Sequence, residues 1–403
     1  MTQLVLFDDG LSRLRPLNDL RCVFDIRVGP LTNAERLCAA LDSDAGALWV
    51  PQRLLALARD EHDLPVNMLG GGGEPMLLVN GRLALAIEAV RTLEVGCALV
   101  EASSDDVIAA RLMPGDARAL LEDGVRPNTV SKVDDDVLLR RPWHFRSVRD
   151  AALDHDLELI LGSVEEDADL PAEVMHIGEH RVVIDPSALV YPRVTLIAED
   201  GPIVIAEQAT VRPGATIIGP AFIGVGATVL EHAIIRPQTT IGPVCKVAGE
   251  VSACVFQGYA NKGHEGFLGD SWIGEWVNLG AGTTGSNLLN TYGDVLCRQM
   301  PDTERENTGE TFLGAIIGDH VKTAIGTRLM TGAILHTGCM VAQTAPVVGT
   351  VAPFTWATDA GHREYRLSKF LHVMRTAMGR RDIEPGEAYI KCVEALASGV
   401  GDA

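Results

Sequence analysis

The segment HEGFLGDSWIGEWVNLGAGT, residues 264–283, contains the side chain best suited to catalysis in this sequence. A neutral imidazole, with an ordinary pKa of about 6.5, takes a proton from an amine near neutral pH, so His264 is a candidate general base. Glycines on both sides of it, Gly263 and Gly266, would let it project from a turn. The alternative is a surface histidine without a catalytic role. We predict a base-catalysed transfer reaction at this segment.

The overall charge limits the partners of the chain. With 34 basic and 54 acidic residues the net charge is −20, which argues against a nucleic-acid or anionic-membrane surface. A phosphate-bearing ligand must then be held by a local cluster of cations. No apolar run approaches the roughly 20 residues of a membrane span, and the N-terminus lacks signal-peptide features, so we expect a cytoplasmic protein. Eight dispersed cysteines without a CxxC pair indicate reduced thiols and no metal site.

A repeat with a period of six residues must position the 264–283 segment. A helix repeats every 3.6 residues and a simple strand every two, so this period indicates one inward aliphatic residue per short strand, with a corner after each. The pattern, which returns at Phe267 and again at Ile317, predicts a left-handed β-helix of hexapeptide repeats, with a β-sandwich as the alternative. The unbroken run consists of Ile205, Val211, Ile217, Ile223, Val229, Ile235, Ile241 and Val247.

The repeat is interrupted twice, and solenoids carry functional loops at such interruptions. The first interruption, residues 248–266, contains His264. The second, residues 283–315, is polar and long, so we expect a functional arm or one that contacts a neighbouring subunit.

Different patterns flank the β-helix. Alternating strand and helix signals in residues 1–165, including helices over 34–41, 53–58 and 83–89, predict an α/β domain with a largely parallel sheet. Two helices are expected near the C-terminus, over residues 363–378 and 385–396. The predicted domains are therefore 1–165, 175–355 for the β-helix and 360–399 for the C-terminal helices.

The 264–283 segment resembles the acetyltransferase domain of the bifunctional N-acetylglucosamine-1-phosphate uridylyltransferase / glucosamine-1-phosphate acetyltransferases. The matching positions are His264, Phe267, Gly269-Asp270, Ile273-Gly274 and Asn278-Leu279-Gly280-Ala281-Gly282-Thr283. The resemblance implies that His264 is the general base and that Asn278 contacts the sugar in the catalytic site. It implies substrate contacts from Phe267 and Asp270, and a phosphate contact from Arg236, for which a salt-bridged exterior arginine is the alternative.

The match departs from the family at the sugar phosphate. Ser252 replaces a phosphate-binding lysine, Phe267 replaces a tyrosine, and no lysine follows the NLGAG segment at the expected place. Lys262 or Lys246 could compensate as a substrate-binding residue. The identities of the sugar and of the acyl group stay open.

By the same resemblance the chain should form a homotrimer, with acetyl-CoA as co-substrate bound beside the glycines Gly280, Ala281 and Gly282. The CoA phosphates need cations, for which we consider Lys322, Arg328 and the pair Arg380-Arg381. The implied role is transfer of an acetyl group to an amino-sugar phosphate, in UDP-N-acetylglucosamine and cell-envelope precursor synthesis.

The N-terminal domain resembles a shortened sugar nucleotidyltransferase through Ser12-Arg13-Leu14-Arg15-Pro16-Leu17. The resemblance implies Asp8, Asp9, Arg13, Arg21 and Asn80 as nucleotidyltransferase-like residues, and nucleotidyl transfer would need Mg²⁺ and a nucleoside triphosphate. The glycines and the lysine of the family's phosphate loop are replaced here, so a domain kept for assembly or regulation is the alternative.

Three other functions remain open for the β-helix. A zinc carbonic anhydrase of this fold needs three converging histidines, and His232, His264 and His336 are too dispersed for this. A non-catalytic nucleotide-sugar-binding or scaffold trimer would explain the missing lysines. A sugar O-acyltransferase could use the same histidine base.

Overall fold

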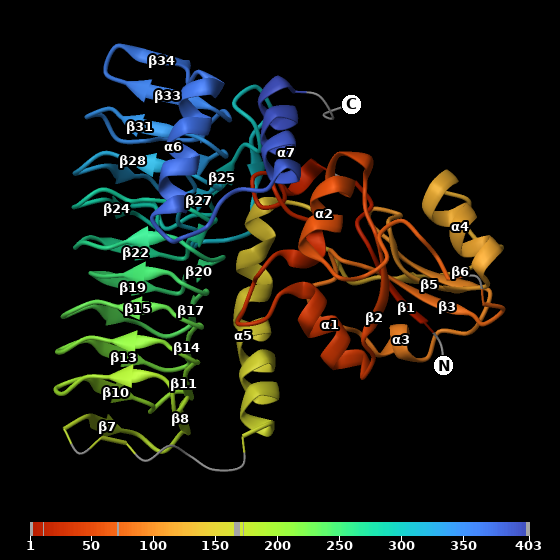
Figure 1. Ribbon diagram of the computed structural model, residues 1–403, viewed down its shortest axis with the longest axis horizontal. Helices are drawn as coiled ribbons and strands as arrows, with labels where there is room; N and C mark the ends of the chain where they lie inside the picture. Colours follow the sequence, from red (N-terminus) through yellow and green to blue (C-terminus); the bar gives the residue numbers. More distant parts are fainter. Residues whose placement is uncertain (1–2, 11, 71, 165–169, 172, 400–403) are drawn as a thin grey trace.

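The computed structural model describes all residues except 1–2, 11, 71, 165–169, 172 and 400–403. An N-terminal α/β domain and a tall β-helix stand side by side (Figure 1). The first C-terminal helix lies against the upper coils of the β-helix, and the second lies between these coils and the N-terminal domain. The boundary predicted near residue 165 falls outside the described residues. No helix in the described ranges has the length and apolarity needed to cross a membrane.

A six-stranded sheet in the order β2-β1-β3-β5-β4-β6 forms the centre of the N-terminal domain. Three of its strand pairs are parallel, and β5 runs antiparallel to both of its neighbours. The predicted α/β fold with a mostly parallel sheet is confirmed. The elements are β1 (Gln3–Phe7), η1 (Ser12–Leu14), η2 (Val23–Asp25), α1 (Asn33–Leu41), β2 (Ala45–Trp49), η3 (Gln52–Leu54), α2 (Leu55–Glu61), β3 (Met76–Asn80), α3 (Glu88–Arg91), β4 (Cys97–Glu101), β5 (Val107–Leu112), α4 (Pro114–Asp123), β6 (Thr129–Val133), η4 (Pro142–His144) and α5 (Phe145–Gly162).

Local sequence explains where one predicted helix of this domain begins, whereas a second helix predicted from local sequence does not form. Thr32 and Glu35 form a capping box that starts α1, which satisfies backbone N–H groups at its first turn. The helix predicted over 83–89 is wrong, because α3 begins only at Glu88. Leu83 instead forms a β-bridge with Leu138, a tertiary contact that overrides the local helical spacing.

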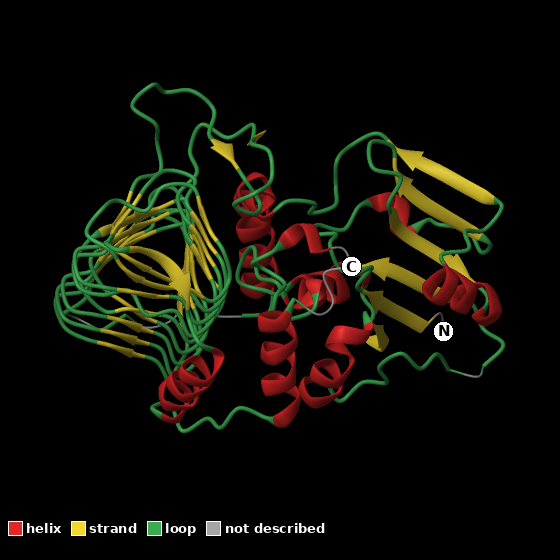
Figure 2. Cartoon of the chain, turned by 90° about the horizontal axis from the view of Figure 1, so that it is seen from above, coloured by secondary structure: helices red, strands yellow, loops and turns green. Residues whose placement is uncertain are grey.

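The β-helix has three faces and a triangular cross-section (Figure 2). The first face holds β7 (Met175–Ile177), β10 (Thr195–Ile197), β13 (Thr216–Ile218), β16 (Ile234–Ile235), β19 (Glu250–Ser252) and β22 (Phe267–Gly269), continued by β24 (Thr284–Gly285) and β29 (Arg328–Leu329). The second face holds β8 (Val182–Ile184), β11 (Ile203–Ile205), β14 (Ala221–Ile223), β17 (Thr239–Ile241), β20 (Val255–Phe256), β23 (Trp272–Ile273), β27 (Ile316–Ile317), β30 (Ile334–Leu335) and β32 (Thr350–Val351). The third face holds β9 (Leu189–Val190), β12 (Thr210–Val211), β15 (Thr228–Val229), β18 (Lys246–Val247), β21 (Asn261–Lys262), β28 (Lys322–Thr323), β31 (Met340–Ala342), β33 (Thr355–Thr358) and β34 (Gly361–Glu364).

The six-residue repeat forms the core of these coils as predicted. The eight residues from Ile205 to Val247 in the repeat are all 0% exposed, and burial of this continuous aliphatic column stabilises the stack. The predicted repeat position at Phe267 is wrong by one residue. Leu268 occupies the core, and Phe267 points outward because neighbouring side chains of a strand face opposite sides.

Two segments outside the coils cover the second face and its edge. Helix α5 runs along this face, where Leu153 and Leu157 pack on Val183 and Val204 (Figure 1). The long interruption after β24 forms a hairpin of β25 (Leu296–Cys297) and β26 (Glu306–Asn307). Its buried side chains pack against the N-terminal domain of the same chain, and Glu306 pairs with Arg141 at 2.8 Å. Its contact with a neighbouring subunit stays a prediction.

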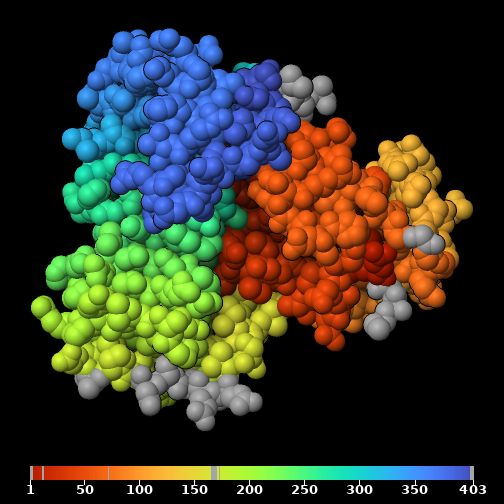
Figure 3. All heavy atoms as spheres, viewed as in Figure 1, coloured from red at the N-terminus to blue at the C-terminus, as the bar shows by residue number. Residues whose placement is uncertain are grey.

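The C-terminal helices α6 (Leu367–Gly379) and α7 (Glu387–Ser398) close over the upper coils and meet the N-terminal domain (Figure 3). The first was predicted to begin at Arg363, which is wrong. Residues 355–364 form the hairpin β33–β34 instead, in which the Arg363 guanidinium lies 4.4 Å from the centre of the Trp356 ring. This cation–π contact favours the strand conformation before α6 starts.

Candidate active site

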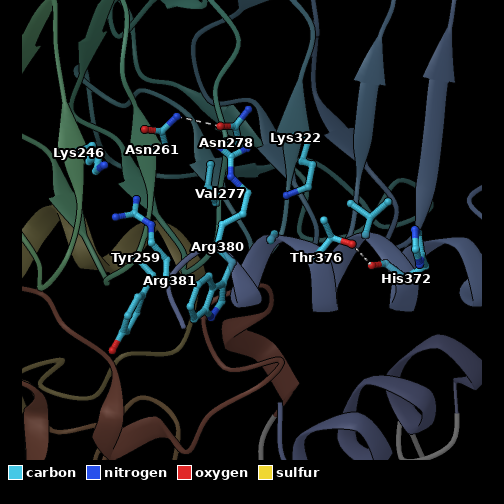
Figure 4. A pocket seen from close by; sticks show the side chains of 13 residues that line it. Lys246, Tyr259, Asn261, Val277, Asn278, Lys322, His372, Thr376, Arg380 and Arg381 are labelled. Atoms are coloured by element: carbon cyan, nitrogen blue, oxygen red, sulfur yellow. Dashed lines mark hydrogen bonds between the residues drawn. The ribbon is translucent and has the colours of Figure 1, made fainter. Parts of the chain in front are cut away.

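A cavity of about 510 Å³ lies between the third face of the β-helix and helix α6. Strand pairing places Lys246, Asn261, Asn278 and Lys322 in one register across successive coils, so their side chains point outward in a row. Arg380 and Arg381, directly after α6, face this row from the other side (Figure 4). We call this cavity the third-face pocket. The structure thus brings together Asn278, Lys322 and the two arginines that the sequence suggested separately.

The third-face pocket concentrates positive charge in an acidic protein. Among the described residues, no carboxylate forms an ion pair with Lys246, Lys322, Arg380 or Arg381, and no acidic residue lines the cavity. Burial lowers the pKa of Lys322 to about 8, so its ammonium gains from a bound anion. Four converging cations without internal partners make this pocket suited to a phosphate-rich ligand.

An aromatic stack and an amide pair complete the pocket, and the sequence reasoning missed both. Tyr259 and Trp276 stack with ring centroids 4.4 Å apart, each at a corner before the third face. Asn261 Nδ2 donates to Asn278 Oδ1 at 2.8 Å, which leaves the Asn278 amide nitrogen to a ligand. The equal spacing of Tyr259–Trp276 and Asn261–Asn278 by one coil of 17 residues is the signal that could have found them.

His264 lies outside this cavity, on the corner that follows β21 and leads to the first face. Its side chain is exposed, and among the described residues none forms a hydrogen bond with its ring. It lies three positions after Asn261 in the sequence, so their Cα atoms are at most about 10 Å apart. The preceding corner between β18 and β19 has two residues, against four between β12 and β13.

The predicted CoA-contacting glycines lie on the next corner along the same edge. Gly282 has φ +70°, and a Cβ atom on Gly280 would approach the backbone of Ala324 to 2.6 Å. The coil stacking alone therefore requires these two glycines. Ala281 lies between them and is half-buried.

Four further predicted residues are placed away from the third-face pocket. Arg236 pairs with Glu250 on the exposed first face, and Phe267 is half-buried on that face. Arg328 is exposed and donates to the Thr344 carbonyl at 2.6 Å. Asp270 is buried and binds Arg146 and Arg149 of α5, each at 2.9 Å.

Asp270 therefore ties α5 to the β-helix, since its other oxygen accepts from Asn287 Nδ2 at 2.8 Å. Lys262 is also buried, at 2% exposed, inside the coils rather than facing a ligand. Asp270 and Lys262 are the two predicted substrate contacts whose side chains are buried and bonded to other groups of the protein.

A second cavity, of about 360 Å³, lies at the carboxyl edge of β1 and β2 in the N-terminal domain. Asp8, Asp9 and Asp106 line it, and burial, with some help from Asp9, raises the pKa of Asp8 to about 6. Asn80 donates to Asp9 at 3.0 Å beside the cavity. Arg13 is exposed on η1.

The basic residues around this second cavity are engaged within the protein. Arg82 binds both Asp9 and Asp106. Arg15 binds Asp19 at 2.6 Å. Arg21, predicted to be nucleotidyltransferase-like, is buried and binds Asp319 of the β-helix at 2.8 Å. In the segment that would hold a triphosphate, Arg15 and Arg21 are thus paired with carboxylates, whereas Arg13 is exposed.

Among the described residues, one group has the geometry to hold a metal ion. Ligand atoms of Asp25, Glu61 and His62 lie within 4.8 Å of one another, and His62 Nε2 is already 3.3 Å from Asp25 Oδ2. His232 and His264 lie on the edge between the third and first faces, whereas His336 is buried on another corner and contacts the Gln299 carbonyl. The three histidines of the carbonic anhydrase alternative do not converge.

Comparison with known proteins supports the resemblance to sugar nucleotidyltransferases and to the bifunctional enzymes. Residues 4–164 match the family described as sugar nucleotidyl transferase. A bifunctional sugar-1-phosphate nucleotidylyltransferase/acetyltransferase of Sulfurisphaera tokodaii is 33% identical over 134 residues, which are 33% of each chain. A bifunctional protein GlmU of Sorangium cellulosum is 28% identical over 146 residues, 36% of this chain and 28% of that protein. The matched region spans about a third of the length of these relatives.

Solved structures similar to this chain include hexapeptide-repeat proteins. A hexapeptide transferase family protein of Anaplasma phagocytophilum is 15% identical, over 57% of this chain and 99% of that one, with a TM-score of 0.24. PerB of Caulobacter crescentus, solved with CoA and GDP-perosamine, is 11% identical, over 90% of this chain and 97% of that one, with a TM-score of 0.18.

Proposed function

We propose that this chain, a divergent relative of the bifunctional sugar-1-phosphate nucleotidylyltransferase/acetyltransferases, transfers an acyl group from acyl-CoA to the amino group of a sugar phosphate. The third-face pocket carries the proposal. Its four cations, which have no carboxylate partner in the described part of the chain, suit the phosphates of CoA. Its aromatic stack suits a nucleobase. Asn278 joins this pocket to the edge that bears His264.

The reaction follows from the order of these groups along the third face. With the CoA phosphates at Lys322, Arg380 and Arg381, the flexible arm of the cofactor can follow the third face toward the edge that bears His264. There the amine attacks the thioester carbonyl carbon, the N–C bond forms and the C–S bond breaks. His264 accepts the amine proton and returns it to the departing sulfur, so the products are an amide and a free thiol. Trimerisation, implied by the family, would place a neighbouring subunit against this edge.

Incubation of the whole protein with acetyl-CoA and a panel of amino-sugar phosphates and UDP-amino sugars tests this function. We expect release of free CoA thiol together with a product about 42 mass units heavier than the acceptor, because an acetyl group replaces one hydrogen. An amide product survives mild base, whereas the ester of an O-acyltransferase is cleaved. Tight binding of acetyl-CoA without turnover on any acceptor would contradict an enzyme and favour the scaffold alternative.

For the N-terminal domain we infer a structural role, support of the β-helix, rather than nucleotidyl transfer. The observation that favours this role is that Arg15, Arg21 and Arg82 form ion pairs with carboxylates. Asp9 and Asp106 are the side chains that would hold Mg²⁺, yet both already bind Arg82. Release of pyrophosphate from a nucleoside triphosphate and a sugar 1-phosphate, in the presence of Mg²⁺, would contradict this inference.

A further inference from the structure

Lys262 occupies a core position that the neighbouring coils give to nonpolar side chains. Strand pairing aligns it with Val247 in the coil before, and Leu279 follows in the coil after. Both neighbours are at most 2% exposed, and so is Lys262. A lysine in such a column pays for desolvation of its ammonium, which a methionine of similar length would avoid.

The contacts of the ammonium show what it does there. Lys262 Nζ donates to the Ala248 carbonyl at 2.7 Å and to the His264 carbonyl at 3.0 Å. Ala248 belongs to the two-residue corner between β18 and β19, and His264 belongs to the corner stacked on it. The side chain therefore joins the shortened corner to the corner that carries the candidate base.

The corner beside Lys262 has room for its ammonium. A Cβ atom on Gly249 would lie 2.9 Å from Lys262 Nζ, so a glycine at the shortened corner makes room for the ammonium. The ionisable groups that act on it are Glu265, on the same corner, and Cys254, inside the coils. Among the described residues no carboxylate forms an ion pair with Lys262, and its acceptors are backbone carbonyls.

We propose that Lys262 is the positioning residue of the reaction: from inside the coils it fixes the 263–266 corner and thereby the direction in which His264 projects. This inference rests on the proposed acyl transfer. The His264 ring has no side-chain partner among the described residues, so its direction depends on its backbone. A misplacement of about 1 Å in a catalytic group lowers a rate by as much as about 100-fold.

The test compares Lys262→Met with Lys246→Met in the full-length protein. Lys262→Met should lower kcat on the order of 10- to 100-fold and leave KM for acetyl-CoA within about twofold. Lys246→Met, which removes a cation from the third-face pocket, should instead raise KM with a smaller change in kcat. Lys262→Gln keeps an N–H donor without the charge, so its kcat should fall between those of the wild type and Lys262→Met. It also serves if the methionine variant does not fold.

Hydrogen exchange of the 263–266 amides provides a readout that needs no turnover. In Lys262→Met we expect faster exchange of the 263–266 amides and unchanged exchange in the coils that precede β18 in the sequence. If the wild type transfers no acyl group, the proposed function fails, while this exchange result still tests the positioning role. Unchanged kcat with unchanged exchange would overturn the inference, as would faster exchange throughout the β-helix, which indicates general destabilisation.

Discussion

The N-terminal domain and the third-face pocket both contain basic residues that were expected to contact phosphate. The two regions differ in whether these residues already have carboxylate partners. In the N-terminal domain, Arg21 and Arg82 are buried against carboxylates. In the third-face pocket, Lys322 and Arg381 are partly exposed and have no carboxylate partner among the described residues. A phosphate that entered the first region would have to break a buried ion pair, whereas the second offers its cations directly.

This difference separates a structural use of arginine from a binding use. Arg21 links the loop after η1 to Asp319 of the β-helix, across 298 positions in sequence. Arg21, which matches a phosphate contact by its position in the sequence, therefore forms an ion pair that joins the two domains. Position in a motif gave the resemblance, but the charge partner in space decides the role.

The largest expected effect concerns the base. If the chemistry belongs to the β-helix, His264→Ala should lower acyl transfer on the order of 10²- to 10⁴-fold, the usual worth of a general base. His232→Ala is a matched control, because His232 is also exposed on the edge between the third and first faces. Steady-state rates of thiol release measure both. A loss of tenfold or less for His264→Ala would point to another base.

The next effect tests the structural half of the comparison. Arg21→Gln leaves the Asp319 carboxylate buried without its cation, so the free energy of unfolding should fall by about 3–5 kcal/mol. Urea denaturation measures the loss, with Arg118→Gln as control, because Arg118 forms an exposed pair on α4 that is worth at most about 1 kcal/mol. The affinity for acetyl-CoA at low denaturant should stay unchanged. Equal losses of stability in the two variants would contradict a stabilising role for the Arg21–Asp319 ion pair.

How much the sequence predicts differs between the same two regions. The β-helix follows from counting, because every inward residue of the Ile205–Val247 run obeys one period. The third-face pocket is only half predictable: Lys322 and Arg381 stand out by charge, yet their meeting depends on how α6 folds back over the coils. Nothing local to Arg380 or Arg381 encodes that packing.

The surroundings of two predicted side chains, Asp270 and Phe267, could not be read from the sequence, for a physical reason. Asp270 matches a family motif, but its partners Arg146 and Arg149 come from α5, more than 120 positions earlier. Phe267 and Leu268 are adjacent apolar residues, so the repeat alone could not decide which faces the core. Long-range pairing and one-residue register shifts are the two features that a single sequence leaves undetermined here.

A smaller effect tests the binding half of the comparison. The double variant Arg380→Glu/Arg381→Glu should weaken acetyl-CoA binding on the order of 10- to 100-fold, since it replaces two phosphate-facing cations by anions. Arg375→Glu is the matched control, because Arg375 is exposed on α6 and does not line the pocket. Titration calorimetry at two salt concentrations measures affinity and its screening. Equal affinity in the wild type and the double variant would remove the third-face pocket as the CoA site.

The smallest effect is a dependence on pH that only one of the two regions can show. Burial lowers the pKa of Lys322 to about 8, and a bound phosphate favours the protonated ammonium and so raises that pKa. The contribution of Lys322 to binding is therefore complete below pH 8 and is lost as the pH rises through 8 toward the pKa of the complex. The arginines keep their charge throughout, because guanidinium groups do not titrate in this range.

Between pH 7 and 9 we therefore expect the affinity of the wild type for CoA to fall a few-fold, at most about tenfold per pH unit for one proton. Lys322→Met should bind more weakly at pH 7 and lose most of this pH dependence, as measured by calorimetry at both pH values. Arg82 and Arg21 carry guanidinium groups with carboxylate partners, so a phosphate site in the N-terminal domain would lack such a lysine-dependent slope. The same slope in wild type and Lys322→Met would exclude Lys322 as a ligand contact and return the question to the N-terminal cavity.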